Sequence, residues 1–195
     1  MENQTFDPAF WSSKYLNSET QWDLGAVSPA LKIYIDQLTD KHVSILIPGC
    51  GNAYEAKYLL EKGFSNITVI DIAPEPIAQL KLAIKDSTRL NLICGDFFEF
   101  QGQFDLILEQ TFFCALPPTA RKAYAIKMHQ LLKEGGKLVG LLFNRNFEQT
   151  TPPFGGNLTE YQRLFTPLFS TVILTPCTDS HPKRQGTELF MQCSK

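Results

Sequence analysis

Short apolar runs alternate with longer amphipathic segments along most of the chain. Runs that are β-branched or leucine-rich and that end at Gly, Pro or Asp are typical of buried strands. We therefore expect strands at 43–47, 66–71, 90–94, 104–109, 137–143, 171–174 and 187–192. The amphipathic segments predict helices at 53–62, 74–85, 118–133 and 158–165, and a further helix that begins at 28–29.

This order of elements predicts the class of fold. Strands that alternate with helices indicate β-α-β units, in which a mostly parallel sheet is covered by helices on both faces. Little sequence separates the last two strands, which favours a hairpin at one edge. We therefore expect an α/β fold built on seven strands. The 195 residues suit a single domain, in which residues 1–40 precede a core of residues 41–195.

Composition and charge narrow the possible partners. Eighteen Lys and Arg against 20 Asp and Glu give a net charge of −2, which argues against nucleic acid. Five widely spaced cysteines and three scattered histidines predict neither a disulfide framework nor a metal site. No signal peptide is visible, and the longest apolar run, 138–143, is too short to span a bilayer. We expect a cytoplasmic protein without a membrane partner. The 12% of aromatic residues fit either a core or a pocket for flat or cationic ligands.

In such sheets ligands bind beyond the carboxyl ends of the strands, so the turns after the strands hold the candidate site. After the first strand, Gly49 and Gly51 let the backbone pass close to a ligand, although a plain tight turn explains them equally well. A dinucleotide site would have a third small residue at position 54, where this chain has Tyr54. A nicotinamide-dependent dehydrogenase is therefore disfavoured.

Acidic residues follow the next two strands. Asp71 lies 20 residues beyond Gly51, where a carboxylate can accept both hydroxyls of a ribose; the alternative is a cap for the following helix. After the third strand, Asp96 can accept from an exocyclic amine and Phe97 can cover the face of a ring. Alone, Gly-Asp is a common turn, but its place in this order strengthens the nucleoside interpretation.

Several motifs give the chain a resemblance to a known family. They are Trp22-Asp23-x-Gly25, Ile47-Pro48-Gly49-Cys50-Gly51, Gly95-Asp96-Phe97-Phe98 and Thr111-Phe112-Phe113-Cys114-Ala115-Leu116, with further matches at 121–125 and 152–154. From about residue 10 to 190 the chain resembles the thiopurine S-methyltransferase superfamily. In the first two thirds it is most similar to the plant halide/thiol methyltransferase branch, whereas 121–125 and 152–154 resemble the thiopurine branch equally well. The resemblance implies a Rossmann-like class I methyltransferase fold, with a mostly parallel sheet and an N-terminal helical lid.

The resemblance also implies ligands and the residues that hold them. S-adenosyl-L-methionine would be the cofactor and S-adenosyl-L-homocysteine the product. The implied cofactor contacts lie on the lid and in the turns after the strands: Trp11, Tyr15, Trp22, Gly49, Gly51, Asp71, Asp96, Phe97 and Glu109. The implied acceptor contacts are aromatic or basic: Phe10, Phe113, Arg121, Phe154 and Arg184. For both arginines a solvated surface charge is the alternative.

The implied reaction is an in-line displacement on a sulfonium, with nucleophile, methyl carbon and sulfur nearly collinear. A dry aromatic pocket suits an anion that attacks a cation. A thiol with a pKa near ~8.5 is partly ionised at neutral pH, and halide or thiocyanate is anionic outright. We therefore expect catalysis by alignment, with no assigned catalytic acid or base and no metal.

Other functions stay open at this point. The acceptor could be a metalloid anion or an oxygen or nitrogen nucleophile. Glu109-Gln110-Thr111 stands where an Asp/Asn-Pro-Pro motif would mark an amide or amino N-methyltransferase. A non-catalytic cofactor-binding module is the third hypothesis, and a degenerate glycine turn or a lost ribose acid would support it; neither is seen. We expect a monomer that acts on a small molecule.

Overall fold

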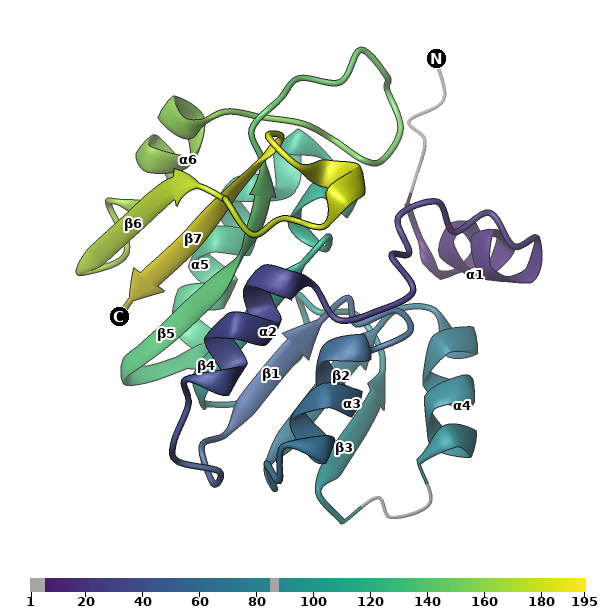
Figure 1. Ribbon diagram of the computed structural model, residues 1–195. Helices are drawn as coiled ribbons and strands as arrows, with labels where there is room; N and C mark the ends of the chain where they lie inside the picture. The colour runs from purple at the N-terminus through teal and green to yellow at the C-terminus, as the bar shows by residue number, and fades with distance from the viewer. Residues whose placement is uncertain (1–5, 85–87) are drawn as a thin grey trace.

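The computed structural model describes residues 6–84 and 88–195. Within these residues, seven strands form one sheet in the order β3-β2-β1-β4-β5-β7-β6 (Figure 1). Their bounds are β1 Ile45–Pro48, β2 Ile67–Asp71, β3 Leu90–Cys94, β4 Phe104–Gln110, β5 Leu132–Phe143, β6 Thr171–Pro176 and β7 Glu188–Ser194. The strands from β1 to β5 pair in parallel, whereas β7 is antiparallel to both β5 and β6. The expected hairpin at one edge is therefore present, with its second strand inserted next to β5.

Helices cover both faces of this sheet (Figure 1). The described helices are α1 Pro8–Leu16, α2 Pro29–Asp36, α3 Tyr54–Glu61, α4 Pro74–Ala83, α5 Arg121–Leu131 and α6 Leu158–Phe165. Short 3-10 turns occur at η1 Phe113–Ala115, η2 Pro118–Ala120 and η3 Pro182–Arg184. None of the described helices is long and apolar enough to cross a membrane.

Side chains of successive strand residues point to opposite layers, as the pleat of a strand requires. Ile45 and Ile47 of β1 belong to the buried cluster that contains Leu59 of α3. Leu46, between them, belongs to the cluster that contains Met128 of α5. Because both faces of β1 are buried, its sequence is a continuous apolar run, and this run made the strand predictable.

One predicted boundary is wrong by several residues. The helix expected at 118–133 begins as a 3-10 turn and ends at Leu131, and β5 begins at Leu132 instead of 137. Leu132 is already extended, with φ −89° and ψ 139°, and it pairs with Phe104 of β4. Pairing with the neighbouring strand overrides the helical pattern here. The last residue of the helix expected at 74–85 lies outside the described residues.

The N-terminal segment, residues 6–27, stands apart from the two helix layers. Its helix α1 begins at Pro8, and the Asp7 side chain caps it by accepting a hydrogen bond from Phe10 N at 2.9 Å. The helix lies beside α4 (Figure 1), where Ser12 Oγ donates to Glu75 Oε2 at 2.8 Å. None of its residues is fully buried, although it carries Phe10, Trp11 and Tyr15.

Candidate functional site

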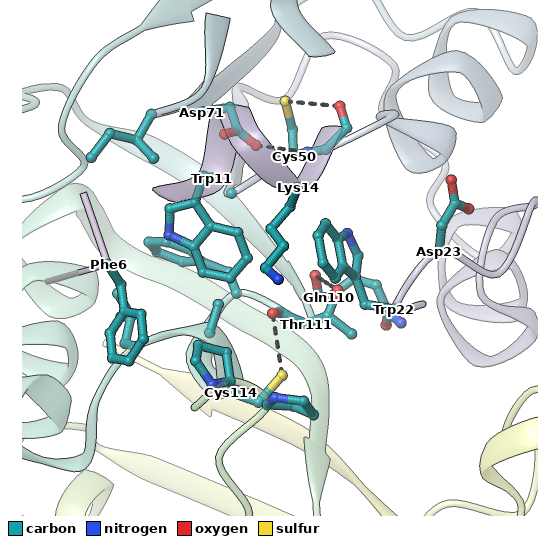
Figure 2. A pocket seen from close by; sticks show the side chains of 18 of the residues that line it. Phe6, Trp11, Lys14, Trp22, Asp23, Cys50, Asp71, Gln110, Thr111 and Cys114 are labelled. Atoms are coloured by element: carbon teal, nitrogen blue, oxygen red, sulfur yellow. Dashed lines mark hydrogen bonds between the residues drawn. The ribbon is translucent and has the colours of Figure 1, made fainter. Parts of the chain in front are cut away.

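A cavity of about 1170 Å³ opens at the carboxyl edge of the sheet. Its walls come from the turns after β1 to β4, from the loop after β5, from η3 and from the N-terminal segment. Figure 2 shows Trp11, Lys14 and Trp22 directed into the space between Asp71 and Cys114. Pockets for one drug-sized ligand hold roughly 300–1,000 Å³, so this cavity is large enough for an organic ligand of that size.

The turn after β1 needs glycine for two separate reasons. Gly49 and Gly51 have φ of 57° and 49°, in the left-handed region that other residues rarely adopt. A Cβ atom at position 49 would lie 2.3 Å from the ring of Phe112, so a larger residue would displace the turn after β4. The glycine turn thus packs closely against the turn after β4, and both glycines line the cavity.

Asp71 ends β2 and is 8% exposed. One carboxylate oxygen accepts from Gly51 N and the other from Ala73 N, each at 2.9 Å. Burial raises the pKa of this carboxyl group, and the backbone hydrogen bonds oppose the rise. The carboxylate therefore ties the first two turns together and keeps lone pairs for a ligand in the cavity.

The turn after β3 contributes an acid and an aromatic ring. Asp96 lines the cavity, and its Oδ1 accepts from Phe98 N at 2.8 Å. Phe97 also lines the cavity, and its ring centroid lies 5.0 Å from that of Phe112 in an edge-to-face arrangement. Asp71 and Asp96 thus lie on the same side of the cavity, as the predicted nucleoside site requires.

Aromatic rings of the N-terminal segment line the cavity. Trp22 is edge-to-face with Trp11 at 5.6 Å and with Tyr15 at 5.8 Å. A Cβ atom on Gly51 would lie 3.1 Å from the Tyr15 hydroxyl, so this hydroxyl reaches the glycine turn. Burial and the nearby Asp71 carboxylate raise the pKa of Tyr15, which keeps the hydroxyl protonated.

Polar contacts of Asp23 and Trp22 also attach the N-terminal segment to the core. Asp23 accepts from the side chains of Asn52 and Tyr54, on the glycine turn and at the start of α3. Arg184 donates from Nη2 to the backbone oxygen of Trp22 at 2.7 Å, and its Nη1 lies 3.4 Å from Glu188 Oε1. Tyr54, whose bulk disfavours a dinucleotide site, therefore helps to attach the N-terminal segment through Asp23.

Most of the predicted cofactor residues meet in this cavity. It is lined by Trp11, Tyr15, Trp22, Gly49, Gly51, Asp71, Asp96 and Phe97, and by the predicted acceptor residues Phe10 and Arg184. Their roles as ligand contacts stay predictions. Arg184 is 8% exposed and already has two partners, so it is no freely solvated charge.

Four predicted residues lie outside the cavity lining: Glu109, Phe113, Arg121 and Phe154. The Arg121 guanidinium pairs with Glu160 and donates to Gly155 O at 2.6 Å, so it fastens α6 and the loop before it. Phe113 is 1% exposed in the core, and Glu109 is fully buried. A motif match predicted where these residues stand in the chain, but not the direction of their side chains.

Gln110 and Lys14 are among the lining residues that were not assigned to the site from the sequence. Gln110 ends β4, and its buried Oε1 has no hydrogen-bond partner among the described residues. Lys14 extends into the cavity (Figure 2), where its Nζ lies 2.6 Å from Glu19 Oε2. The rule that ligands lie beyond strand ends could have predicted Gln110. Lys14 follows Trp11 by three residues, so it shares that face of a helix.

These residues fit the cofactor that the resemblance implies. The buried carboxylate after β2 suits a ribose, and the acid and ring after β3 suit an adenine. The Gln110 oxygen, buried without a donor, suits an ammonium or amide N–H. Within the described residues, no group of three or more His, Cys, Asp or Glu is arranged to hold a metal ion.

Comparison with known proteins decides the family. The family model described as "Thiopurine S-methyltransferase (TPMT)" matches residues 6–192. The chain belongs to the thiopurine S-methyltransferase family. A relative named "Probable thiol methyltransferase 2", from Arabidopsis thaliana, is 28% identical over 162 residues, which cover 81% of this chain and 72% of the relative. The thiopurine S-methyltransferase of Vibrio parahaemolyticus is 28% identical over 207 residues and 95% of either chain.

Solved structures agree with this family at the level of fold. A Burkholderia thailandensis 1,6-didemethyltoxoflavin-N1-methyltransferase, solved with S-adenosylhomocysteine, matches with a TM-score of 0.74 at 18% identity. The match covers 100% of this chain and 93% of the other. The predicted family, α/β fold class and S-adenosylmethionine-dependent methyltransferase activity are confirmed. The lid role of the N-terminal segment stays a prediction.

Proposed function

We propose that this member of the thiopurine S-methyltransferase family transfers a methyl group to a thiol or another soft, polarisable anion in the cavity at the strand ends. One observation carries the proposal: the cavity is lined by acidic side chains where β2 and β3 end, and by basic side chains after β5 and before β7. Asp71 and Asp96 follow β2 and β3, whereas Arg145 follows β5 and Lys183 precedes β7. The acidic side chains suit a nucleoside and its cationic sulfur, and the basic side chains suit an anionic acceptor.

The chain's part in this reaction would be to bind and align. The cofactor supplies a methyl group activated on a sulfonium sulfur. Asp71 would hold the ribose, Asp96 and Phe97 the adenine, and the rings of Trp11 and Trp22 would exclude water. None of the three histidines, all within the described residues, lines the cavity. A thiolate needs no base to attack, so catalysis by alignment agrees with this lining.

A substrate panel tests the proposal. We would first measure binding of S-adenosylmethionine by calorimetry. Incubation with iodide, bisulfide, thiocyanate, thiophenols and thiopurines should then yield S-adenosylhomocysteine from at least one of them, detected by chromatography. Turnover with oxygen or nitrogen acceptors alone would overturn the choice of acceptor. No binding at all would overturn the proposed site.

Location and assembly are part of the same proposal. We expect a monomeric, cytoplasmic enzyme with a small-molecule acceptor and without nucleic acid or membrane as partner. The net charge of −2 supports this expectation for nucleic acid. Light scattering behind a sizing column measures the mass of the particle. A mass near 22.0 kDa is expected, and a mass of twice that value contradicts the monomer.

A further inference from the structure

Glu109 is a fully buried carboxylate in the middle of the sheet. It stands next to the last residue of β4 and opposite Gly140 of β5. A Cβ atom at position 140 would lie 2.4 Å from the Glu109 Cβ, so only glycine leaves room for this side chain to turn across β5. The pairing of Glu109 with Gly140 thus leaves space for the Glu109 side chain inside the protein.

Three hydrogen-bond donors surround this carboxylate, and no cation does. Oε1 accepts from Phe112 N at 2.8 Å and Phe113 N at 3.0 Å, and Oε2 accepts from the Tyr124 hydroxyl at 2.6 Å. Among the described residues, no Lys, Arg or His lies within ion-pair distance of it. Buried charges are ordinarily paired with a charge of opposite sign. A positive charge from a ligand would complete this site.

The carboxylate lies directly behind the cavity wall. Gln110, Thr111 and Phe112, the three residues that follow it, line the cavity. Its two backbone donors belong to this same turn, and the Phe112 ring touches Gly49 of the glycine turn. Only a few atoms of one turn therefore separate the buried charge from the cavity. A buried charge is screened less than one in water, so the field of Glu109 acts on a ligand in the cavity more strongly than that of an exposed acid would.

We propose that Glu109 is the counter-charge for the sulfonium of the bound cofactor and that it makes the protein favour S-adenosylmethionine over S-adenosylhomocysteine. This inference rests on the proposed function. The two molecules differ by the methyl group and by the positive charge on sulfur, so only the first gains from a negative charge behind the wall. The same charge would help release the neutral product after transfer, because its attraction disappears with the sulfonium.

The charge on Glu109 changes near neutral pH. Burial raises the pKa of Glu109 to about 7, although the hydrogen bonds from Tyr124, Phe112 and Phe113 lower it. The titratable groups that face it are the hydroxyl of Tyr124 on α5 and the thiol of Cys114 on η1, both neutral at this pH because burial raises their pKa values. A bound cation favours ionised Glu109, so affinity for S-adenosylmethionine rises with pH and binding near pH 7 releases protons.

Calorimetry with both cofactor forms tests this linkage. From pH 5.5 to 8.5, wild-type affinity for S-adenosylmethionine relative to S-adenosylhomocysteine should rise about tenfold, the equivalent of one unit in the pKa of Glu109. Glu109→Gln should abolish the rise and leave the lower ratio at every pH. Titrations at pH 7 in phosphate and in Tris, two buffers with different heats of ionisation, measure the protons released on binding. The wild type should release protons when it binds S-adenosylmethionine but not when it binds S-adenosylhomocysteine. Glu109→Gln should release fewer protons with S-adenosylmethionine than the wild type does.

Two further variants make the result decisive. Glu61→Gln, on an exposed part of α3, changes net charge equally and should behave as wild type. Tyr124→Phe removes a donor to the carboxylate, so the rise in affinity should move to higher pH; this variant serves if Glu109→Gln does not fold. A Glu109→Gln protein with the wild-type ratio and pH dependence refutes the inference. Methyl transfer by that protein would still leave the proposed function standing.

Discussion

At the scale of single residues, Asp71 is the clearest case in which a side chain has two tasks. Its carboxylate holds Gly51 N and Ala73 N, so it shapes the turns whether or not a ligand is present. Asp71 is not the cap of the following helix, because the N-cap of α4 is Ala73 and no side chain caps it; Asp71 instead accepts from the N–H of Ala73. The remaining lone pairs face the cavity, which is why the ribose role stays the preferred prediction.

Asp71→Asn removes the charge and one of the two acceptor oxygens while keeping the size of the side chain, so it tests the contribution of this carboxylate to cofactor binding. We expect affinity for S-adenosylmethionine to fall at least tenfold, because hydrogen bonds to a charged acceptor contribute about 1.5–3 kcal/mol. Calorimetry measures the loss. Asp40→Asn, at an exposed turn, is the matched control and should bind as wild type. If both proteins bind alike, Asp71 is only a turn residue.

The positions of several site residues could be predicted from the sequence, but the orientation of the Glu109 side chain could not. Gly49, Gly51, Asp71 and Asp96 were predictable because strand ends of a parallel sheet gather at one edge. The inward turn of Glu109 was not, because it depends on Gly140 across the strand pair, and register is unknown before folding.

At the scale of elements, η3 and the N-terminal segment depend on each other. Arg184 lies at the end of η3, where its guanidinium bonds Trp22 O, and it stacks 5.3 Å from the Phe143 ring centroid. Sequence reasoning assigned this arginine to the acceptor because a motif match carries no information about which neighbour a side chain will choose. The segments that alternate strongly were predicted well. The contact between η3 and the N-terminal segment was not, because nothing periodic marks it.

Arg184→Lys tests this attachment. Lysine keeps the charge beside Glu188 but cannot hold both partners as a planar guanidinium does. We expect the KM for S-adenosylmethionine to rise about three- to tenfold, because a more mobile N-terminal segment must become ordered when the cofactor binds. The free-energy cost of this ordering is about 0.5–1.5 kcal/mol for each side chain that is immobilised.

Steady-state kinetics at saturating acceptor measures that KM, and Arg163→Lys, on the exposed face of α6, is the control. An unchanged KM with a lowered melting temperature would mean that Arg184 serves stability alone.

At the scale of the whole molecule, the cysteines differ in whether the fold buries them or exposes them to solvent. All five are free, and only Cys94 is exposed. Cys50 and Cys114 line the cavity. Burial raises the pKa of the Cys50 thiol well above its usual value. Burial also raises the pKa of the Cys114 thiol, to about 12. Protonated, buried thiols react slowly. The sequence predicted the absence of a disulfide framework, but not which thiol would face solvent.

Native labelling with a maleimide at pH 7 should therefore give one adduct per chain within minutes, measured by mass spectrometry. Cys94→Ser should remove it. Rapid labelling of two or more thiols in the native protein would contradict the burial of the other four cysteines. Slow labelling of Cys50 or Cys114 should be further slowed by S-adenosylhomocysteine, since both thiols line the same cavity.

The bond between Arg184 and Trp22 joins residues 162 positions apart, near the two ends of the chain. Contacts of such long range form late, because a large loop must close before they contribute. On the ribosome, the strands that carry Gly51 and Asp71 emerge early, but the segment that covers them cannot be fastened until η3 has emerged. A nascent chain could thus form the hydrogen bond between Arg184 and Trp22 only after η3 has been synthesised, long after the strands that carry Gly51 and Asp71.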